Sequence, residues 1–151
     1  SFNNIISGGM PEKGFLPKKA GGDLGTVEIP DAVNKSMFMK GVSGGSAGLE
    51  AEFSNIGNQP TTISFRFMVP TVSSFAMPEI GDNNGNCDVL LELENNVLKV
   101  SGDTILNITP KKWYYAEVVL NFSDNVGYKV FVIELMISSS FTANIIASRM
   151  Y

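Results

Sequence analysis

The side chains best suited to chemistry fall on the expected outer faces of β-strands. They mix aromatic rings with charged groups: Arg66, Glu92, Trp113, Tyr115, Glu117 and Lys129. Sugars need that mixture, because the apolar face of a sugar ring stacks on an aromatic ring while its hydroxyls bond to charged or amide groups. If these strands share one sheet, we expect a shallow carbohydrate-binding face. The predicted sugar contacts are Arg66, Glu92, Tyr115 and Glu117. The alternative is an ordinary solvated sheet face, or one covered by residues 1–30.

A second candidate site is the loop over residues 82–88, which concentrates side-chain oxygens. Calcium takes about six to eight oxygen ligands, and alternate Asp and Asn positions on a loop can present them. The predicted metal ligands are Asp82, Asn84, Asn86 and Asp88. The loop lacks the distal bidentate glutamate of an EF-hand, and the alternative is an Asx-rich turn, which Asp and Asn favour by themselves. Calcium is the one cofactor that the sequence suggests.

The sequence contains little that indicates a catalytic site. The chain has no histidine, which excludes Ser-His-Asp and Cys-His catalysis and histidine-ligated zinc. The segment Gly44–Gly48 fits a Gly-x-Ser-x-Gly pattern, but that nucleophile needs a histidine base and a strand-to-helix turn. The pairs Glu50 with Glu52 and Glu92 with Glu94 could support glycoside hydrolysis, although acidic residues on the wet side of a strand also serve solubility. The sequence therefore favours a protein that is not an enzyme.

Composition narrows the class of protein. The chain has 151 residues and a net charge of −4, with arginine only at positions 66 and 149, so no nucleic-acid partner is expected. No apolar run approaches the roughly 18 residues that span a membrane. The lone Cys87 excludes an internal disulfide. We predict one domain over residues 1–151.

The strongest structural signal runs from Thr109 to Glu134. Residues 114–122 and 128–134 alternate with a period of two, which is typical of strands with one dry face. The polar segment 123–127 favours a turn, since Asp and Asn bond to their own backbone and Gly accepts positive φ. A hairpin this apolar needs a second sheet to cover it.

Shorter segments with similar alternation surround this hairpin. The predicted strands are residues 26–29, 36–40, 47–53, 61–69, 74–76, 89–93, 97–100, 105–108 and 145–151, with a tight turn at Asn95-Asn96. Residues 1–24 are expected to form an extended loop and a short edge strand near Phe2 and Ile5. No window shows a capped helical period. About a dozen short strands predict an all-β fold, a two-sheet antiparallel jelly-roll sandwich.

Three segments combine into a family pattern: NKSMFMK at Asn34–Lys40, TTISFRFMVP at Thr61–Pro70 and PKKWYYAEVVLNFSDNVGYKVFV at Pro110–Val132. Together they resemble the concanavalin A-like lectin/glucanase superfamily, in its laminin-G-like branch. The segment Gly8–Pro11 is similar to the Gly-x-x-Pro entry of sandwich domains attached to secreted polysaccharide-degrading enzymes. The resemblance implies a curved jelly roll that binds sugars and, in some members, calcium. Hydrolases of the family carry a Glu-x-Asp-x-x-Glu triad on one strand, and this chain has none.

The sequence therefore predicts a non-catalytic carbohydrate-binding module of a secreted or cell-surface protein, of bacterial origin. Its expected partners are a polysaccharide or glycan and neighbouring domains of a larger chain. One alternative is a structural or adhesive sandwich that packs against a neighbouring domain and binds no sugar. A second alternative is a polysaccharide lyase or glycoside hydrolase, which needs two carboxylates about 5–10 Å apart.

Overall fold

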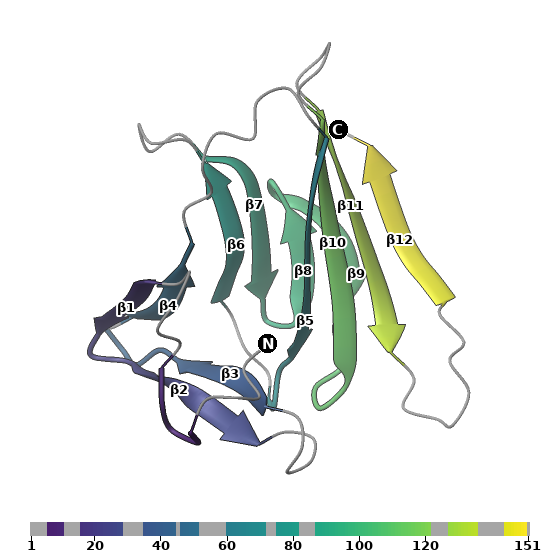
Figure 1. The fold of residues 1–151 in the computed structure, drawn as a ribbon. Coiled ribbons are helices and arrows are strands. Elements are labelled where there is room, and N and C mark those ends of the chain that lie inside the picture. The colour runs from purple at the N-terminus through teal and green to yellow at the C-terminus, as the bar shows by residue number, and fades with distance from the viewer. Residues whose placement is uncertain are drawn as a thin grey trace. The chain divides into compact units, whose positions relative to one another are not determined.

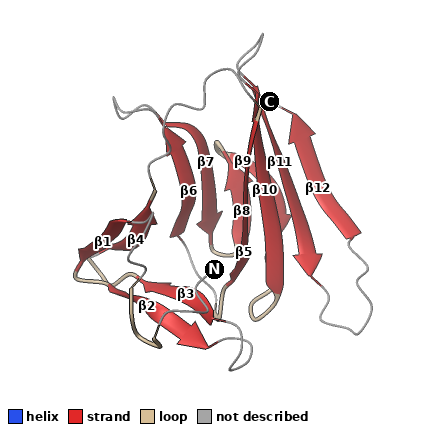
Figure 2. Cartoon of the chain, in the orientation of Figure 1, coloured by secondary structure: helices blue, strands red, loops and turns tan. Residues whose placement is uncertain are grey.

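The structure is a computed structural model, and it describes residues 6–10, 16–28, 35–44, 46–51, 60–71, 75–81, 87–121, 127–135 and 144–150. Every regular element among these residues is a β-strand and none is a helix (Figure 2). The all-β prediction is confirmed. The described part of the chain also contains no helix long and apolar enough to cross a membrane. The chain divides into two compact units, Ser1–Asn55 and Ile56–Tyr151. The expectation that all 151 residues fold as one domain stays a prediction.

The first unit contains two antiparallel strand pairs. Its strands are β1 (Leu16–Ala20), β2 (Asp23–Glu28), β3 (Lys35–Lys40) and β4 (Ser46–Glu50). β1 pairs with β4, and β2 pairs with β3. Gly25 of β2 lies against the backbone of Gly8, and a Cβ atom at Gly25 would sit 3.1 Å from the Gly8 carbonyl oxygen. This close approach explains why a glycine occupies the middle of that strand.

The second unit contains two four-stranded antiparallel sheets (Figure 1). The β10 sheet has the order β12-β11-β10-β5, from β5 (Thr61–Met68), β10 (Trp113–Asn121), β11 (Gly127–Leu135) and β12 (Asn144–Met150). The β7 sheet has the order β6-β7-β8-β9, from β6 (Phe75–Gly81), β7 (Cys87–Glu94), β8 (Val97–Val100) and β9 (Asp103–Asn107).

Apolar side chains from both sheets of the second unit form one buried cluster. The β7 sheet supplies Leu91, Leu93, Leu98 and Val100, and the β10 sheet supplies Tyr114, Ala116, Val118, Leu120, Val130 and Val132. These positions are two residues apart along each strand, as the pleat of a strand requires. Burying one large apolar side chain stabilises the folded state by about 1.5–3 kcal/mol. The cluster therefore determines which face of each sheet points inward.

The predicted central hairpin is confirmed. β10 and β11 pair from Trp113 with Leu135 to Asn121 with Gly127. From Trp113 to Leu120 the even-numbered residues of β10 are buried and the odd-numbered ones are half-buried. In β5 the residues Thr62, Ser64 and Arg66 are exposed, as the alternation of that strand predicts. The turn over residues 122–126 lies outside the described residues.

The N-terminal prediction is wrong in one respect. Leu16–Ala20 forms β1, although its proline and two lysines favour an exposed loop. Its partner β4 explains the difference, because the backbone hydrogen bonds of a strand pair do not depend on side-chain alternation. The edge strand expected near Phe2 and Ile5 falls outside the described residues.

The two hairpins of the β7 sheet turn through residues with positive φ. Asn95 and Asn96 have φ of 49° and 65°, and the flanking Glu94 and Val97 pair directly. Ser101 and Gly102 have φ of 47° and 88° between the paired Val100 and Asp103. Positive φ at both central residues defines a type I′ turn, which suits the twist of a hairpin and favours Asn and Gly. The predicted turn at Asn95-Asn96 is confirmed.

We expect Asn96→Val to be less stable than Asn96→Gly by at least about 1 kcal/mol. A β-branched residue is strained at positive φ, whereas glycine is not. Urea unfolding of the two variants measures this difference in the free energy of unfolding. Equal stabilities would contradict the turn type.

Candidate functional site

The outer face of the β10 sheet gathers most of the predicted sugar-contact residues. Tyr115 pairs with Arg66 of β5 on one side and with Ile133 of β11 on the other. Glu117 pairs with Ser64 and with Phe131 in the same way. We call this surface the Tyr115 face. Its described side chains are Thr62, Ser64, Arg66, Met68, Trp113, Tyr115, Glu117, Val119, Lys129, Phe131 and Ile133.

The Tyr115 face is only partly accessible to water, and its character changes from strand to strand. Ser64 and Arg66 on β5 are exposed, whereas Tyr115 and Glu117 on β10 are half-buried. Phe131 on β11 is also half-buried. Aromatic, apolar, hydroxyl and charged groups are thus within one or two strand spacings of each other, each spacing being about 4.8 Å.

A short hydrogen bond holds the ring of Tyr115. Its hydroxyl donates to Oε2 of Glu117 at 2.6 Å, and the two residues are neighbours on the same side of β10. Ser64, which pairs with Glu117 from β5, lies near enough to lower the pKa of the Tyr115 hydroxyl. Tyr115 leans along its own strand toward Glu117. A ring held in this way loses little side-chain entropy when a ligand stacks on it.

The electrostatics of Tyr115 follow from these contacts. The hydrogen bond to Glu117 is the largest influence and raises the pKa of Tyr115 above its ordinary value of 10.0. The nearby Ser64 hydroxyl and the positive charge of Arg66 act in the opposite direction and lower this pKa. The phenol is neutral at physiological pH, so it serves as a donor to Glu117 rather than as a charge.

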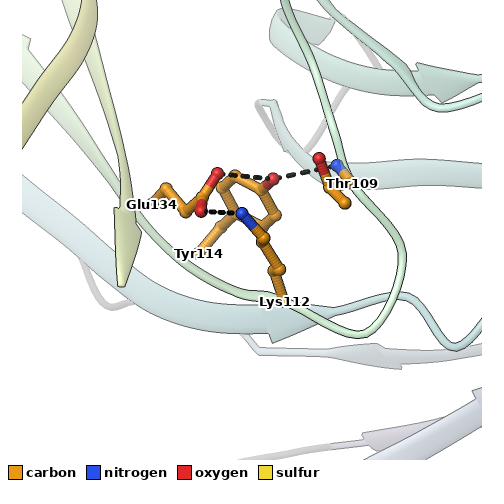
Figure 3. A network of polar contacts seen from close by, with 4 residues as sticks. All are labelled: Thr109, Lys112, Tyr114 and Glu134. Atoms are coloured by element: carbon orange, nitrogen blue, oxygen red, sulfur yellow. Dashed lines mark hydrogen bonds and ion pairs between the residues drawn. The ribbon is translucent and has the colours of Figure 1, made fainter. Parts of the chain in front are cut away.

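A second polar network lies at the end of the same strands, on the core-facing side (Figure 3). The Tyr114 hydroxyl accepts a hydrogen bond from the backbone N–H of Thr109 at 2.9 Å and donates to Oε2 of Glu134 at 3.2 Å. Lys112 forms an ion pair with Oε1 of Glu134. The hydrogen bond within this pair, and to a smaller extent the attraction between the opposite charges, raises the pKa of Lys112. The Tyr114 ring is fully buried and stacks on Phe67, with centroids 5.5 Å apart.

This network fixes the segment that enters β10 and so positions Tyr115. Residues 108–112 connect β9 in one sheet to β10 in the other. In that segment the Lys111 N–H donates to the Val69 carbonyl at 2.7 Å, and Lys111 has a φ of 64°. A tyrosine hydroxyl that bonds back to the chain just before its strand has the same geometry as the tyrosine corner of β-sandwiches.

The other predicted sugar contact lies elsewhere. Glu92 belongs to β7, opposite Lys99 of β8, while its neighbours Leu91 and Leu93 are buried in the core. It therefore lies on the outward face of the β7 sheet and not on the Tyr115 face. Glu94 on the same strand forms an ion pair with Lys99, which lowers the pKa of Glu94 and raises that of Lys99.

The predicted calcium ligands are mostly outside the described residues. Residues 82–86 join β6 to β7 and are not described, and Asp88 is placed on β7 without a described side chain. Elsewhere in the described chain, no three acidic or cysteine side chains gather as a metal site would require. The calcium site stays a prediction.

Two residues of these polar arrangements, Ser64 and Glu134, were not predicted from the sequence. Ser64 lowers the pKa of Tyr115, yet only the strand register shows that this serine on β5 lies beside that part of β10. Glu134 falls in the inward phase of β11, and a carboxylate at an inward position is a signal for a polar partner, which is Tyr114 here.

Comparisons of the chain with models of known protein families, with curated proteins and with solved structures find no match.

We expect Tyr114→Phe to lower the free energy of unfolding by about 1–2 kcal/mol, because it removes both hydrogen bonds at a buried ring. Tyr128→Phe is the matched control. The Tyr128 hydroxyl bonds to that of Ser101 at 2.7 Å in an exposed position, where water can replace the partner. Urea unfolding should show the larger loss for Tyr114→Phe, and equal losses would argue against the anchoring role of the network.

The raised pKa of Tyr115 predicts a change in stability at alkaline pH. A group that holds its proton more tightly when folded contributes stability that is complete below the unfolded pKa and is lost as pH rises through the folded pKa. The contribution should therefore disappear above a pH of about 10. Tyrosinate absorbance of the wild type minus that of Tyr115→Phe isolates this titration. In a Glu117→Gln background the titration should move to lower pH, and no movement would contradict the bond.

Proposed function

We propose that the protein is a non-catalytic carbohydrate-binding module that holds a polysaccharide on its Tyr115 face, within a secreted or cell-surface protein. The observation that supports this proposal is the arrangement of Arg66, Tyr115 and Glu117 on one sheet face, with the tyrosine ring fixed in advance by its hydrogen bond. A preformed sheet face binds a sugar by stacking and hydrogen bonding without covalent chemistry.

We also propose that the fold is a jelly-roll sandwich of the concanavalin A-like type. Two four-stranded antiparallel sheets that contribute side chains to one buried cluster support it. A sheet buried on one face and open to water on the other alternates as β5 and β10 do.

The second candidate function is a structural or adhesive domain that packs against a neighbouring domain and binds no sugar. The exposed apolar side chains of the first unit favour it: Ile6, Leu16, Phe38, Met39 and Val42. Apolar surface of this kind is typical of protein interfaces when it is contiguous. A lyase or hydrolase needs two carboxylates at one site, and of the described side chains of the Tyr115 face only Glu117 provides one.

Calorimetric titration with a panel of neutral and acidic polysaccharides tests the proposed function. We expect Tyr115→Ala to weaken binding by about tenfold or more, because it removes the stacking ring. Tyr115→Phe keeps the ring and loses its hydrogen bond to Glu117, so its affinity should fall between those of Tyr115→Ala and the wild type.

The control is Lys99→Gln, on the outward face of the other sheet, which should bind as the wild type does. Each titration is run with calcium and again with a chelator, so that a loss under chelator reports on the loop at residues 82–88. Absence of binding throughout the panel, or equal affinities for Tyr115→Ala and the wild type, would favour the structural domain.

A further inference from the structure

We propose that the Tyr115 face prefers acidic glycans and that Arg66 binds the carboxylate or sulfate group of the sugar. This inference rests on the proposed function and names the class of glycan. It starts from the position of Arg66, which is exposed on β5 directly opposite Tyr115.

The guanidinium of Arg66 is available for a ligand. In the described part of the chain, no hydrogen bond or ion pair involves the Arg66 side chain. Among the described side chains of the face, the one carboxylate is that of Glu117, which pairs with Ser64 rather than with Arg66. Its Oε2 already accepts a hydrogen bond from Tyr115. Tyr115 thus bonds to the Glu117 carboxylate, which would otherwise compete with a ligand for the Arg66 guanidinium.

The local charge of the face differs from that of the whole protein. Its described side chains include two cations, Arg66 and Lys129, against the single carboxylate of Glu117, whereas the whole chain has a net charge of −4. A surplus of positive charge on one face of an acidic protein is complementary to an anionic ligand.

The spacing of the two side chains fits an acidic sugar. Directly opposed residues on neighbouring strands have Cβ atoms about 4.5–5.5 Å apart. The carboxylate of a uronic acid is attached to the edge of the sugar ring, so a ring stacked on Tyr115 would present its acid group toward the neighbouring guanidinium. Arginine binds carboxylate and sulfate oxygens through two parallel N–H donors, which a lysine cannot do.

The test compares polymers that differ only in their acid groups. Polygalacturonate is titrated against its carboxyl-reduced, neutral counterpart, and dextran sulfate against dextran. We expect the wild type to bind at least one acidic polymer about tenfold more tightly than its neutral partner, the effect of one or two charge-assisted hydrogen bonds. Which acidic polymer shows the preference distinguishes a carboxylate from a sulfate as the bound group.

The variants assign the preference to one residue. Arg66→Gln should bring the affinity for the acidic polymer down to that for its neutral partner, and Arg66→Lys should retain part of the difference. Lys99→Gln makes the same change in net charge on the other sheet and should keep the full preference. Thermal unfolding of each variant separates lost contacts from lost fold, and little change is expected for the two Arg66 variants, whose side chain is exposed.

Two results would overturn the acidic preference while the proposed function stands. One is equal binding of the acidic polymers and their neutral partners by the wild type. The other is a preference that persists in Arg66→Gln. If no polymer binds, both the preference and the proposed function are wrong.

Discussion

The register of β10 between β5 and β11 is the constraint on which the rest of the second unit depends. Because side chains alternate across a strand, a shift of one residue would move Tyr114, Val118 and Leu120 from the core to water and bring the charged residues inward. The cost of exposing several large apolar side chains makes such a shift prohibitive. Burial of one set of residues therefore determines that Tyr115 and Glu117 share the opposite face.

Polar contacts complete this arrangement where the apolar core ends. Tyr114 and Tyr128 both point their rings into the core side of the sheet, and both use their hydroxyls at its margins, toward Glu134 and Ser101 respectively. The chain must cross from one sheet to the other at residues 108–112. There the backbone N–H and C=O groups no longer pair with a neighbouring strand. The backbone N–H groups of Thr109 and Lys111 donate to the Tyr114 hydroxyl and the Val69 carbonyl, so these hydrogen bonds hold the crossing in place.

The chemistry of the Tyr115 face follows from how its groups are paired. The carboxylate of Glu117 is satisfied within the protein by Tyr115, and this bond fixes the ring at the same time. Arg66 across the strand pair is left to face solvent. The proposed ligand is therefore one that supplies an apolar ring face and an acidic group together, which a polyuronate or a sulfated glycan does.

The all-β class, the central hairpin and the turn at Asn95-Asn96 could be predicted from the amino-acid sequence alone. These rest on period-two alternation and on positive-φ preferences, which act over a few neighbouring residues. Only the tertiary structure separated Glu92 from Arg66, Tyr115 and Glu117, because alternation shows that a side chain points outward but not from which sheet. It also revealed β1, where pairing with β4 overrides an unfavourable local composition, and the pairing of Ser64 on β5 with Glu117 beside Tyr115. Contacts of this kind join residues far apart in the chain, and they exist only once the strand order and register are set.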